Sequence, residues 1–364
     1  MKVLLTLAFI GMTLAHIEAF GQARYALIFL AIMAYFVTRR SIFVTDRVAY
    51  NLGGGLVLAG MTIASLWHGN WVSYGYVIFG VLNFLFLPIF GNRAVDDRML
   101  MVFYWLLLLS LFPFTYDAYG RPNTHFENPN NYAGVTFASL YFGMLLYRNN
   151  PWMQVVVWAI SGVLILLAAS RSVVGAYAIF TLLYLGQRFV LRTHLRWSLV
   201  VAFFVVAAAY LTMVTDDRYA LVATIQESEL SEKNARGLSH RDELYAVSLR
   251  IQEEYPEGVG LGRSNLYIKE RIGRGLSPHN AYLKIWLEGG YLMIVGFLIM
   301  ALGYLATNRS WLASSFLFAL LFRAFFESSA PFTVSLISMM LVLPMFLNER
   351  TVRPVAVRFK LSAA

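Results

Sequence analysis

Long apolar runs separated by short polar loops dominate the chain. A membrane-spanning helix needs about 20 mainly apolar residues, and about twelve stretches come close to that requirement. They lie at 3–19, 23–38, 49–67, 71–90, 99–116, 132–147, 152–169, 173–187, 197–214, 281–305, 311–325 and 331–347. The least regular are 173–187, which is short, and 311–325, which contains Arg323. The pattern predicts an all-α, polytopic integral membrane protein with about twelve transmembrane helices.

The first apolar run has two interpretations. Lys2, a short apolar run and small residues before His16 are typical of a cleaved signal peptide. Gln22 and Arg24, however, lead at once into the next span, which favours a retained first helix. Cleavage would remove one span without changing the sidedness of the others.

An amphipathic helix is predicted in the longest polar stretch of the chain. Ser239 and Asp242 resemble a capping box, and apolar residues recur at helical spacing from Leu244 to Ile251. These signals predict a helix over 240–254.

This polar stretch divides the chain into three parts. Residues 1–214 hold about nine spans with short loops, and 215–280 form one long loop. Residues 281–364 hold about three spans and a basic tail.

The composition agrees with a membrane protein and excludes several chemistries. Hydrophobic residues make up 59% of the chain and charged residues 13%, with a mean hydropathy of +0.61. A soluble domain has about twice that charged fraction. The absence of cysteine excludes disulfides and thiolate metal sites, and the six histidines show no metal-binding spacing. We therefore expect no metal and no cofactor.

The positive charge of +9 indicates how the chain is oriented in the membrane. Alternate loops and the C-terminal tail carry most of the cations outside the long loop, while the short loops between them carry only Arg24, Arg121 and Arg171. The cation-rich segments contain Arg39, Arg40, Arg47, Arg93, Arg98, Arg148, Arg188, Arg192, Arg196, Arg309, Arg350, Arg353, Arg358 and Lys360. Positive residues mark the cytoplasmic side, and long loops escape this rule. Both termini are therefore predicted to be cytoplasmic, and the loop 215–280 periplasmic.

A glycine triplet at 53–55 opens the third span. It lacks the Lys-Ser/Thr of a phosphate loop, so close helix packing is the favoured interpretation.

Four polar stretches are predicted to lie on the same periplasmic side. They are RPNTHFENPNNYAG (121–134), AASRSVVGA (168–176), SHRDELYAV with GVGLGRSN (239–247 and 258–265), and SPHNAYLKIWLEGGYLMIVG (277–296). Four such clusters at one interface predict a functional site there.

Each polar residue also has a structural interpretation. Asn130 or Asn131 is a candidate N-cap of the following helix. Arg171 is a candidate snorkelling anchor, although it lies in a tight turn. Arg241 fits the polar face of the amphipathic helix. A purely structural role is hardest to assign to His279. It directly precedes a predicted helix that carries charged residues, and the ordinary pKa of histidine suits proton transfer.

Intramembrane charges and the glycines have structural interpretations too. Lys284 and Glu288, and likewise Arg323 and Glu327, are spaced as i,i+4 pairs. Glu288 would lie roughly 13 Å deeper than His279, which is too far to touch a sugar bound beside His279. The stretch GVGLG, with Gly260 and Gly262, is too short for a dinucleotide fingerprint and indicates a flexible segment or a tight backbone approach.

These motifs together resemble the O-antigen ligase and O-antigen polymerase superfamily. HNAYLKIWLEGG is similar to its HN-x-x-L-x-x-x-x-E-x-G signature, FENPNNYA to its F-x-N-P-N-x-x-A stretch, and LAASRSVVGA to its S-R-[SG] hairpin. RDELYAVSLRIQEEYPEGVGLG matches its Arg-led helix followed by a glycine stretch. One departure is Met293, where such proteins often have a second glycine; we expect this position to serve helix packing.

The resemblance implies a glycosyltransferase in the bacterial inner membrane. Such proteins move a glycan from an undecaprenyl-diphosphate carrier to a sugar hydroxyl in the periplasm, with inversion and without metal or nucleotide. It implies that Arg171 and Arg241 hold the diphosphate and that His279 is the general base or positions the acceptor hydroxyl. Residues implied in substrate binding are Asn280, which is also a candidate helix cap, Asn130, Arg263, Arg274, Gly260 and Gly262.

Several functions stay open at this point. A ligase uses the lipid A–core as acceptor, whereas a polymerase extends an O-antigen, capsule or exopolysaccharide chain. Protein-directed transfer is a third possibility in the superfamily. A lipid-linked glycan flippase would need polar residues along a continuous path through the bilayer, and a scaffold would need no reactive residues.

Overall fold

The computed structural model is a helical assembly with one small sheet. It describes residues 30, 33, 41–44, 48–86, 97–112, 116, 121–122, 129–186, 239–273, 275–308, 310–328 and 355–358. The helices are α3 Val48–His68, α4 Trp71–Phe86, α5 Asp97–Ser110, α6 Pro129–Leu146, α7 Pro151–Leu167, α8 Arg171–Gly186, α12 Ser239–Glu254, α13 Ser264–Ile272, α14 Ala281–Thr307 and α15 Trp311–Arg323. Strands β1 Ser41–Val44 and β2 Val355–Arg358 pair antiparallel.

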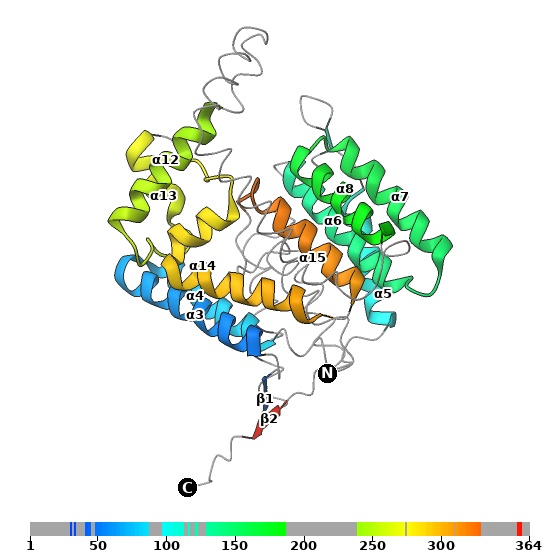
Figure 1. Cartoon of the computed structure of the whole chain (residues 1–364), viewed down its shortest axis with the longest axis horizontal. Coiled ribbons are helices and arrows are strands. Elements are labelled where there is room, and N and C mark those ends of the chain that lie inside the picture. The colour runs from blue at the N-terminus through cyan, green and yellow to red at the C-terminus, as the bar shows by residue number, and fades with distance from the viewer. Residues whose placement is uncertain are drawn as a thin grey trace.

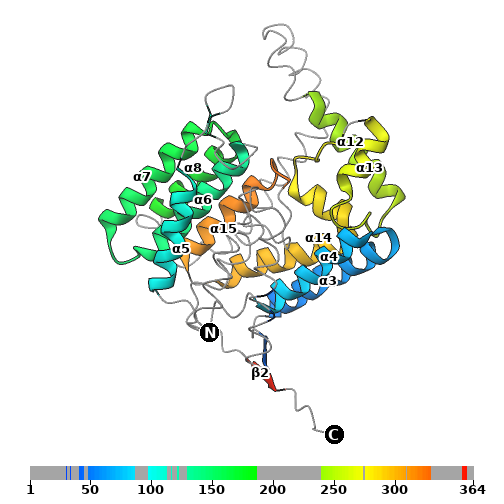
Figure 2. The ribbon, with the colours of Figure 1, turned by 180° about the vertical axis from the view of Figure 1, so that it is seen from behind.

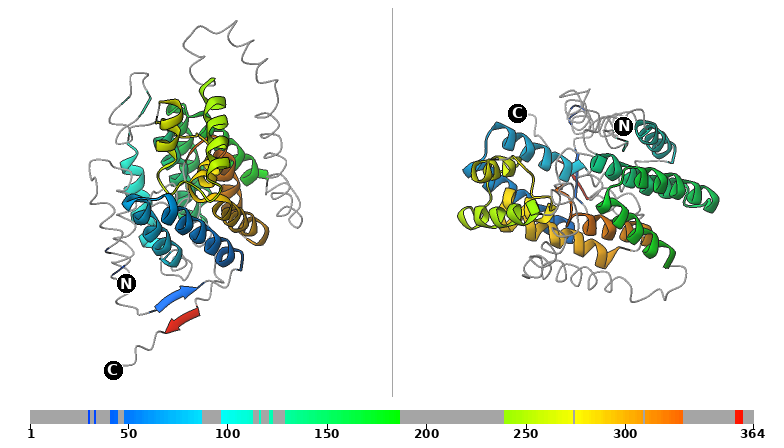
Figure 3. Two further views of the ribbon diagram at one scale, coloured as in Figure 1. Left: turned by 90° about the vertical axis from the view of Figure 1, so that its left-hand side faces the viewer. Right: turned by 90° about the horizontal axis from the view of Figure 1, so that it is seen from above.

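The helices form two groups that α15 joins (Figure 1). One group contains α3, α4 and α14, with α12 and α13 at its upper end, and the other contains α5 to α8 (Figures 1 and 2). The paired strands lie at the opposite end, beyond α3 (Figure 3). Because β1 lies in the predicted cytoplasmic loop between the spans 23–38 and 49–67, and β2 lies in the predicted cytoplasmic tail, their pairing is compatible with the predicted sidedness.

Helix α6 is the centre of the second group. Every residue from 132 to 145 is buried, as expected for a helix that is apolar on all sides. Phe316 of α15 stacks on Phe137 and Tyr141 of α6, with ring centroids 4.8 Å and 4.5 Å apart. This aromatic contact fixes α15 against α6.

Glycines allow α3 and α14 to pack at very close range. A Cβ at Gly53 would lie 2.5 Å from the carbonyl oxygen of Gly296, and one at Gly60 would lie 3.0 Å from the Cβ of Met293. The predicted packing role of the glycine triplet is confirmed for Gly53 and Gly54, whereas Gly55 is exposed and has no close neighbour. Met293 is fully buried in the contact between α3 and α14.

Helix α14 is bent where the sequence predicted a single straight span. Gly290 has φ 65° and ψ −165°, which interrupts the helix between Ala281 and Thr307. Figure 1 shows the short first part of α14 running at an angle to the longer second part. This bend creates the docking surface for the loop that precedes α13.

Eight of the predicted spans correspond to α3–α8, α14 and α15, and the predicted amphipathic helix corresponds to α12. The spans 3–19, 23–38, 197–214 and 331–347 lie outside the described residues, apart from two isolated positions. By length and composition α3 and α14 are long enough to cross a membrane, and the shorter apolar helices lie in α4, α5, α7, α8 and α15. Helix α13 and the two strands were not predicted. The twelve-span count and the three-part division of the chain stay predictions.

Candidate functional site

The C-terminal end of α15 brings together helix starts that are far apart in sequence. The hydroxyl of Ser172, in the first turn of α8, donates to Glu327 Oε1 at 2.8 Å. The backbone N–H of Ala281, which opens α14, donates to the carbonyl of Ala324 at 2.8 Å. Two of the four predicted polar clusters therefore converge on the turn that ends α15.

The start of helix α6 also lies beside the end of α15, together with the starts of α8 and α14. A Cβ at Gly134, in the second turn of α6, would lie 3.0 Å from a terminal nitrogen of Arg323. The guanidinium thus lies directly on the helix backbone where the FENPNNYA cluster begins its helix. We call the group formed by the starts of α6, α8 and α14 and the end of α15 the helix-start cluster.

Arg323 does not form the ion pair that its spacing to Glu327 predicted. Its side chain is 3% exposed, and its Nε and one terminal nitrogen have no hydrogen-bond partner among the described residues. Glu327 lies beyond the end of α15, and its charge acts on Arg323 without a close ion pair between the two side chains. Glu327 accepts from Ser172 instead.

Arg171 is exposed and is the first residue of α8. The hairpin before it is tight: Ala169 has φ 51°, and the hydroxyls of Ser170 and Ser172 lie 3.4 Å apart. A cation at a helix N-terminus opposes the helix dipole, at a cost of about 0.3–1 kcal/mol. An arginine in this position is therefore poorly placed for stability and well placed for an anion that also uses the helix N-terminus.

Arg241 is the third residue of α12, so it also belongs to the first turn of a helix. Its side chain lies outside the described part of the structure, and its distance to Arg171 stays a prediction. Like Arg171, Arg241 is therefore a cation placed at the positive end of a helix dipole.

His279 and Asn280 lead into α14. His279 has φ 49°, and among the described residues it shares a positive φ only with glycines and Ala169. Such strained residues cluster at functional sites. The side-chain oxygen of Asn280 accepts from the N–H of Leu283 at 3.0 Å, so Asn280 is the N-cap of α14. Its capping interpretation is confirmed, and a contact with sugar stays a prediction.

Asn130 lies inside the first turn of α6, because the helix begins at Pro129. The expectation that Asn130 or Asn131 is the N-cap is wrong. Proline suits the first helical position, since it has no N–H that needs a partner and its φ is already helical. Asn130 is partly exposed in this turn.

The bend of α14 is docked onto the glycine loop between α12 and α13. The N–H groups of Val259 and Gly260 donate to the carbonyls of Leu287 and Glu288, at 2.8 Å and 3.2 Å. The loop and the bend approach so closely that a Cβ at Gly290 would lie 2.6 Å from the carbonyl oxygen of Glu257. Of the two interpretations of GVGLG, the tight backbone approach is therefore confirmed.

Glu288 is 2% exposed at this junction. The hydroxyl of Ser264 in α13 donates to Glu288 Oε1 at 2.6 Å, while Lys284 Nζ is 3.9 Å from the same oxygen. The predicted pair with Lys284 is present but long, and the short contact is to Ser264, which sequence reasoning missed. Glu288 thus ties the bend of α14 to α13.

Gly260 and Gly262 have positive φ of 89° and 74°. Gly260 is buried and its N–H is used by α14, which gives it a packing role. Gly262 is exposed beside the ring of Tyr76. Arg263 lies over the ring of Tyr267, 5.1 Å from its centroid, and Arg274 lies outside the described residues.

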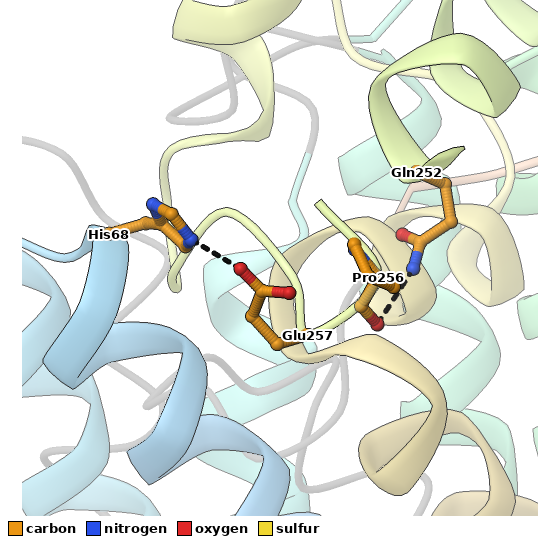
Figure 4. Close-up of polar contacts among 4 residues, drawn as sticks. All are labelled: His68, Gln252, Pro256 and Glu257. Atoms are coloured by element: carbon orange, nitrogen blue, oxygen red, sulfur yellow. Dashed lines mark hydrogen bonds and ion pairs between the residues drawn. The ribbon is translucent and has the colours of Figure 1, made fainter. Parts of the chain in front are cut away.

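A hydrogen bond between His68 and Glu257 joins the end of α3 to the glycine loop (Figure 4). His68 Nε2 and Glu257 Oε1 are 2.5 Å apart, and the imidazole packs edge-on against Tyr255. The hydrogen bond from His68 lowers the pKa of the Glu257 carboxyl. Gln252 Nε2 donates to the carbonyl of Pro256 at 3.1 Å and fixes the same turn. No sequence signal identified His68, because its partner is 189 residues away.

Within the described ranges, no three His, Asp or Glu side chains come together in a way that would hold a metal ion. The metal-independent reaction stays a prediction.

Comparison with known proteins supports the resemblance seen in the sequence motifs. Residues 155–301 match the protein-family model described as O-Antigen ligase. The matched region runs from α7 into α14 and contains Arg171, Arg241 and His279. No curated protein and no solved structure shows significant similarity to the chain.

Proposed function

We propose that this chain, whose residues 155–301 match the O-antigen ligase family model, moves a glycan from an undecaprenyl-diphosphate carrier to a sugar hydroxyl at the periplasmic face of the inner membrane. The family consists of membrane proteins with ligase- or polymerase-like activity. The observation that carries the proposal is the helix-start cluster, where three positive helix ends meet beside Arg171 and next to His279.

The leaving group is a lipid diphosphate, whose negative charge grows as the glycosidic C–O bond breaks. Helix N-termini and arginine are the protein groups best suited to hold phosphate oxygens, because their N–H donors are fixed and arginine keeps its proton. Arg171 is exposed at the start of α8 and Arg241 lies in the first turn of α12. We assign both to diphosphate binding and to stabilisation of its departure.

The acceptor hydroxyl attacks the anomeric carbon as the carrier diphosphate leaves. Its oxygen forms the new C–O bond, the old bond to the diphosphate breaks, and the hydroxyl proton passes to His279. A neutral imidazole can accept this proton near pH 7. The strained backbone of His279 just before the cap of α14 supports its role, because it holds the ring at the mouth of the helix. One displacement inverts the anomeric centre and requires no carboxylate nucleophile.

The acceptor distinguishes a ligase from a polymerase, and we propose the ligase with lipid A–core as acceptor. The support is the motif set and the single long polar segment late in the chain, which contains α12 and α13. The alternative is a polymerase that adds repeat units to an O-antigen, capsule or exopolysaccharide chain. Both use the same donor chemistry.

Deletion of the gene, followed by a gel of lipopolysaccharide and an assay of carrier-linked glycan, separates these activities. Bare core with long carrier-linked chains identifies a ligase. Core with one repeat identifies an O-antigen polymerase, and normal lipopolysaccharide with a lost capsule or secreted polymer identifies an exopolysaccharide polymerase. A deletion strain with unchanged lipopolysaccharide, carrier-linked glycan and secreted polymer would refute the proposal.

The residue roles are tested by complementing the deletion strain with Arg171→Ala and His279→Ala. We expect either change to abolish most transfer while the protein reaches the membrane in normal amounts. Arg148→Ala is a matched control, because Arg148 is an exposed arginine that pairs with Asp97 far from the helix-start cluster. Normal transfer by either site variant would show that the proposed mechanism is wrong.

A further inference from the structure

The side chain of Arg323 is the one feature of the helix-start cluster that neither the packing nor the proposed roles of the other residues explain. It is 3% exposed, yet its Nε and one terminal nitrogen find no acceptor among the described residues. A buried cation without hydrogen bonds is costly, so proteins keep it only where an anion or another partner completes it.

The helix dipole explains only part of this arrangement. Arg323 is the last residue of α15, and a cation there interacts favourably with the negative end of its own helix. The same position, however, faces the backbone of α6 at Gly134, close to the positive end of that helix. Since the starts of α8 and α14 also contact this turn, positive helix ends outnumber the single negative one.

The charges of the cluster leave it positive overall. Arg171 and Arg323 each contribute one positive charge, and Glu327 contributes one negative charge, which accepts from Ser172 and also acts on Arg323. Three helix N-termini and one C-terminus add about half a charge each, positive and negative respectively. The cluster therefore carries about two positive charges, which matches a diphosphate in sign and approximate size.

We infer that Arg323 is a third phosphate-binding cation of this protein, and that its free N–H groups complete their hydrogen bonds on the diphosphate of the lipid-linked donor. This inference rests on the proposed function and deepens it. Arg171 offers an exposed charge to an incoming donor, whereas Arg323 offers preoriented donors inside the cluster. The contact with Gly134 keeps the guanidinium in place, because no side chain stands between it and α6.

Binding of inorganic pyrophosphate to the full-length protein in detergent tests this inference without any glycan. Ligand binding to the folded state raises the unfolding temperature, so a titration yields the dissociation constant Kd. We expect Arg323→Met to raise Kd by about ten- to a hundredfold, because each charge-assisted hydrogen bond to phosphate is lost. Arg323→Lys should give an intermediate Kd, since it keeps the charge but not the forked geometry.

The same variants distinguish binding from a structural role. Without pyrophosphate, Arg323→Met should unfold at or above the wild-type temperature, because a methionine of similar volume removes an unpaired buried charge. Failure of this variant to fold, or a lower unfolding temperature, would show that Arg323 supports the fold and would overturn the inference. Arg148→Met removes an exposed arginine at a distant ion pair and should leave Kd unchanged.

Three further outcomes distinguish pyrophosphate from bulk lipid as the bound anion, and failure of this inference from failure of the proposed function. If nanodiscs containing phosphatidylglycerol, but not pyrophosphate, give the Arg323-dependent stabilisation, the cation binds bulk lipid and the inference is wrong. If the gene deletion leaves every glycan unchanged while Arg323→Met weakens pyrophosphate binding, the phosphate site stands and the transfer proposal fails. If transfer is established but Kd is the same in Arg323→Met, only the role of Arg323 is refuted.

Discussion

Replacing Gly290 by alanine should disrupt the junction between α14 and the glycine loop. Its φ of 65° and ψ of −165° belong to a backbone region that side chains avoid, at a cost of about 1–3 kcal/mol. The added Cβ would also lie 2.6 Å from the carbonyl oxygen of Glu257 and 2.7 Å from that of Pro256. Backbone atoms cannot rotate away, so overpacking adds about 1–3 kcal/mol. We expect Gly290→Ala to lower the free energy of unfolding by about 2–6 kcal/mol.

Thermal unfolding of the purified protein in detergent measures this effect. For a chain of 364 residues, a loss of this size corresponds to a fall in Tm of roughly 3–8 °C. Gly55→Ala is the matched control, because Gly55 is helical and exposed and its added Cβ would meet nothing within 4 Å. That change should leave Tm equal or slightly higher, since alanine favours the helix by about 0.8–1 kcal/mol. If Gly290→Ala unfolds at the wild-type temperature, or the two variants lose equal stability, the bend is not held by the contact described.

Three other changes test separate contacts. The hydrogen bond from His68 lowers the pKa of Glu257, so it stabilises the fold above the ordinary value of 4.5 and is lost as pH falls through the lower folded pKa. Glu257→Gln should lower Tm at pH 7, with a difference from wild type that shrinks as the pH falls below 4.5. A difference that stays constant with pH would contradict the assignment. Ser264→Ala removes the hydroxyl donor of buried Glu288 and should cost about 1–3 kcal/mol in chemical denaturation, more than Glu288→Gln, whose amide oxygen still accepts; the reverse order would exclude this contact. Arg171→Ala should reduce the transfer rate about 10²–10³-fold while Tm stays equal or rises, and a fall in both would indicate a structural role.

Positions of the helices could be predicted because apolar runs report which segments are buried or face lipid. The run 49–67 corresponds to α3 at Val48–His68, and the amphipathic pattern over 240–254 corresponds to α12 at Ser239–Glu254. The glycine triplet was also informative, since three residues without side chains at the start of a span leave close packing as their main use. The helix positions and the glycine packing could be predicted because each depends on a pattern among residues that are close in the sequence.

Partners could not be predicted where a helix ends or bends. The i,i+4 spacing of Arg323 and Glu327 indicates a pair only if the helix continues between them, and α15 ends at Arg323. Glu288 was expected deep inside a straight span, but the bend at Gly290 brings it to Ser264. A local pattern does not contain the position of another segment in space, so both partners required the structure.

The helix-start cluster illustrates the same limit. Sequence motifs placed the polar stretches on one side of the membrane, which agrees with the convergence of the starts of α6, α8 and α14 on the end of α15. Nothing in the spacing indicated that Ser172 would bind Glu327 or that the guanidinium of Arg323 would lie on Gly134. Those contacts depend on how three helices pack around one turn.

The bend of α14 has a consequence for how this segment can enter a membrane. In hydrocarbon every backbone carbonyl needs a donor, because no water is present to supply one. Two carbonyls just before the bend, those of Leu287 and Glu288, accept from Val259 and Gly260. The 27-residue helix therefore does not contain all of its own hydrogen-bond donors. In the predicted topology, which makes the preceding polar loop periplasmic, the final shape of α14 can form only after that loop has crossed the membrane. Translocation of the loop and completion of the span would then be a single step in the biogenesis of the protein.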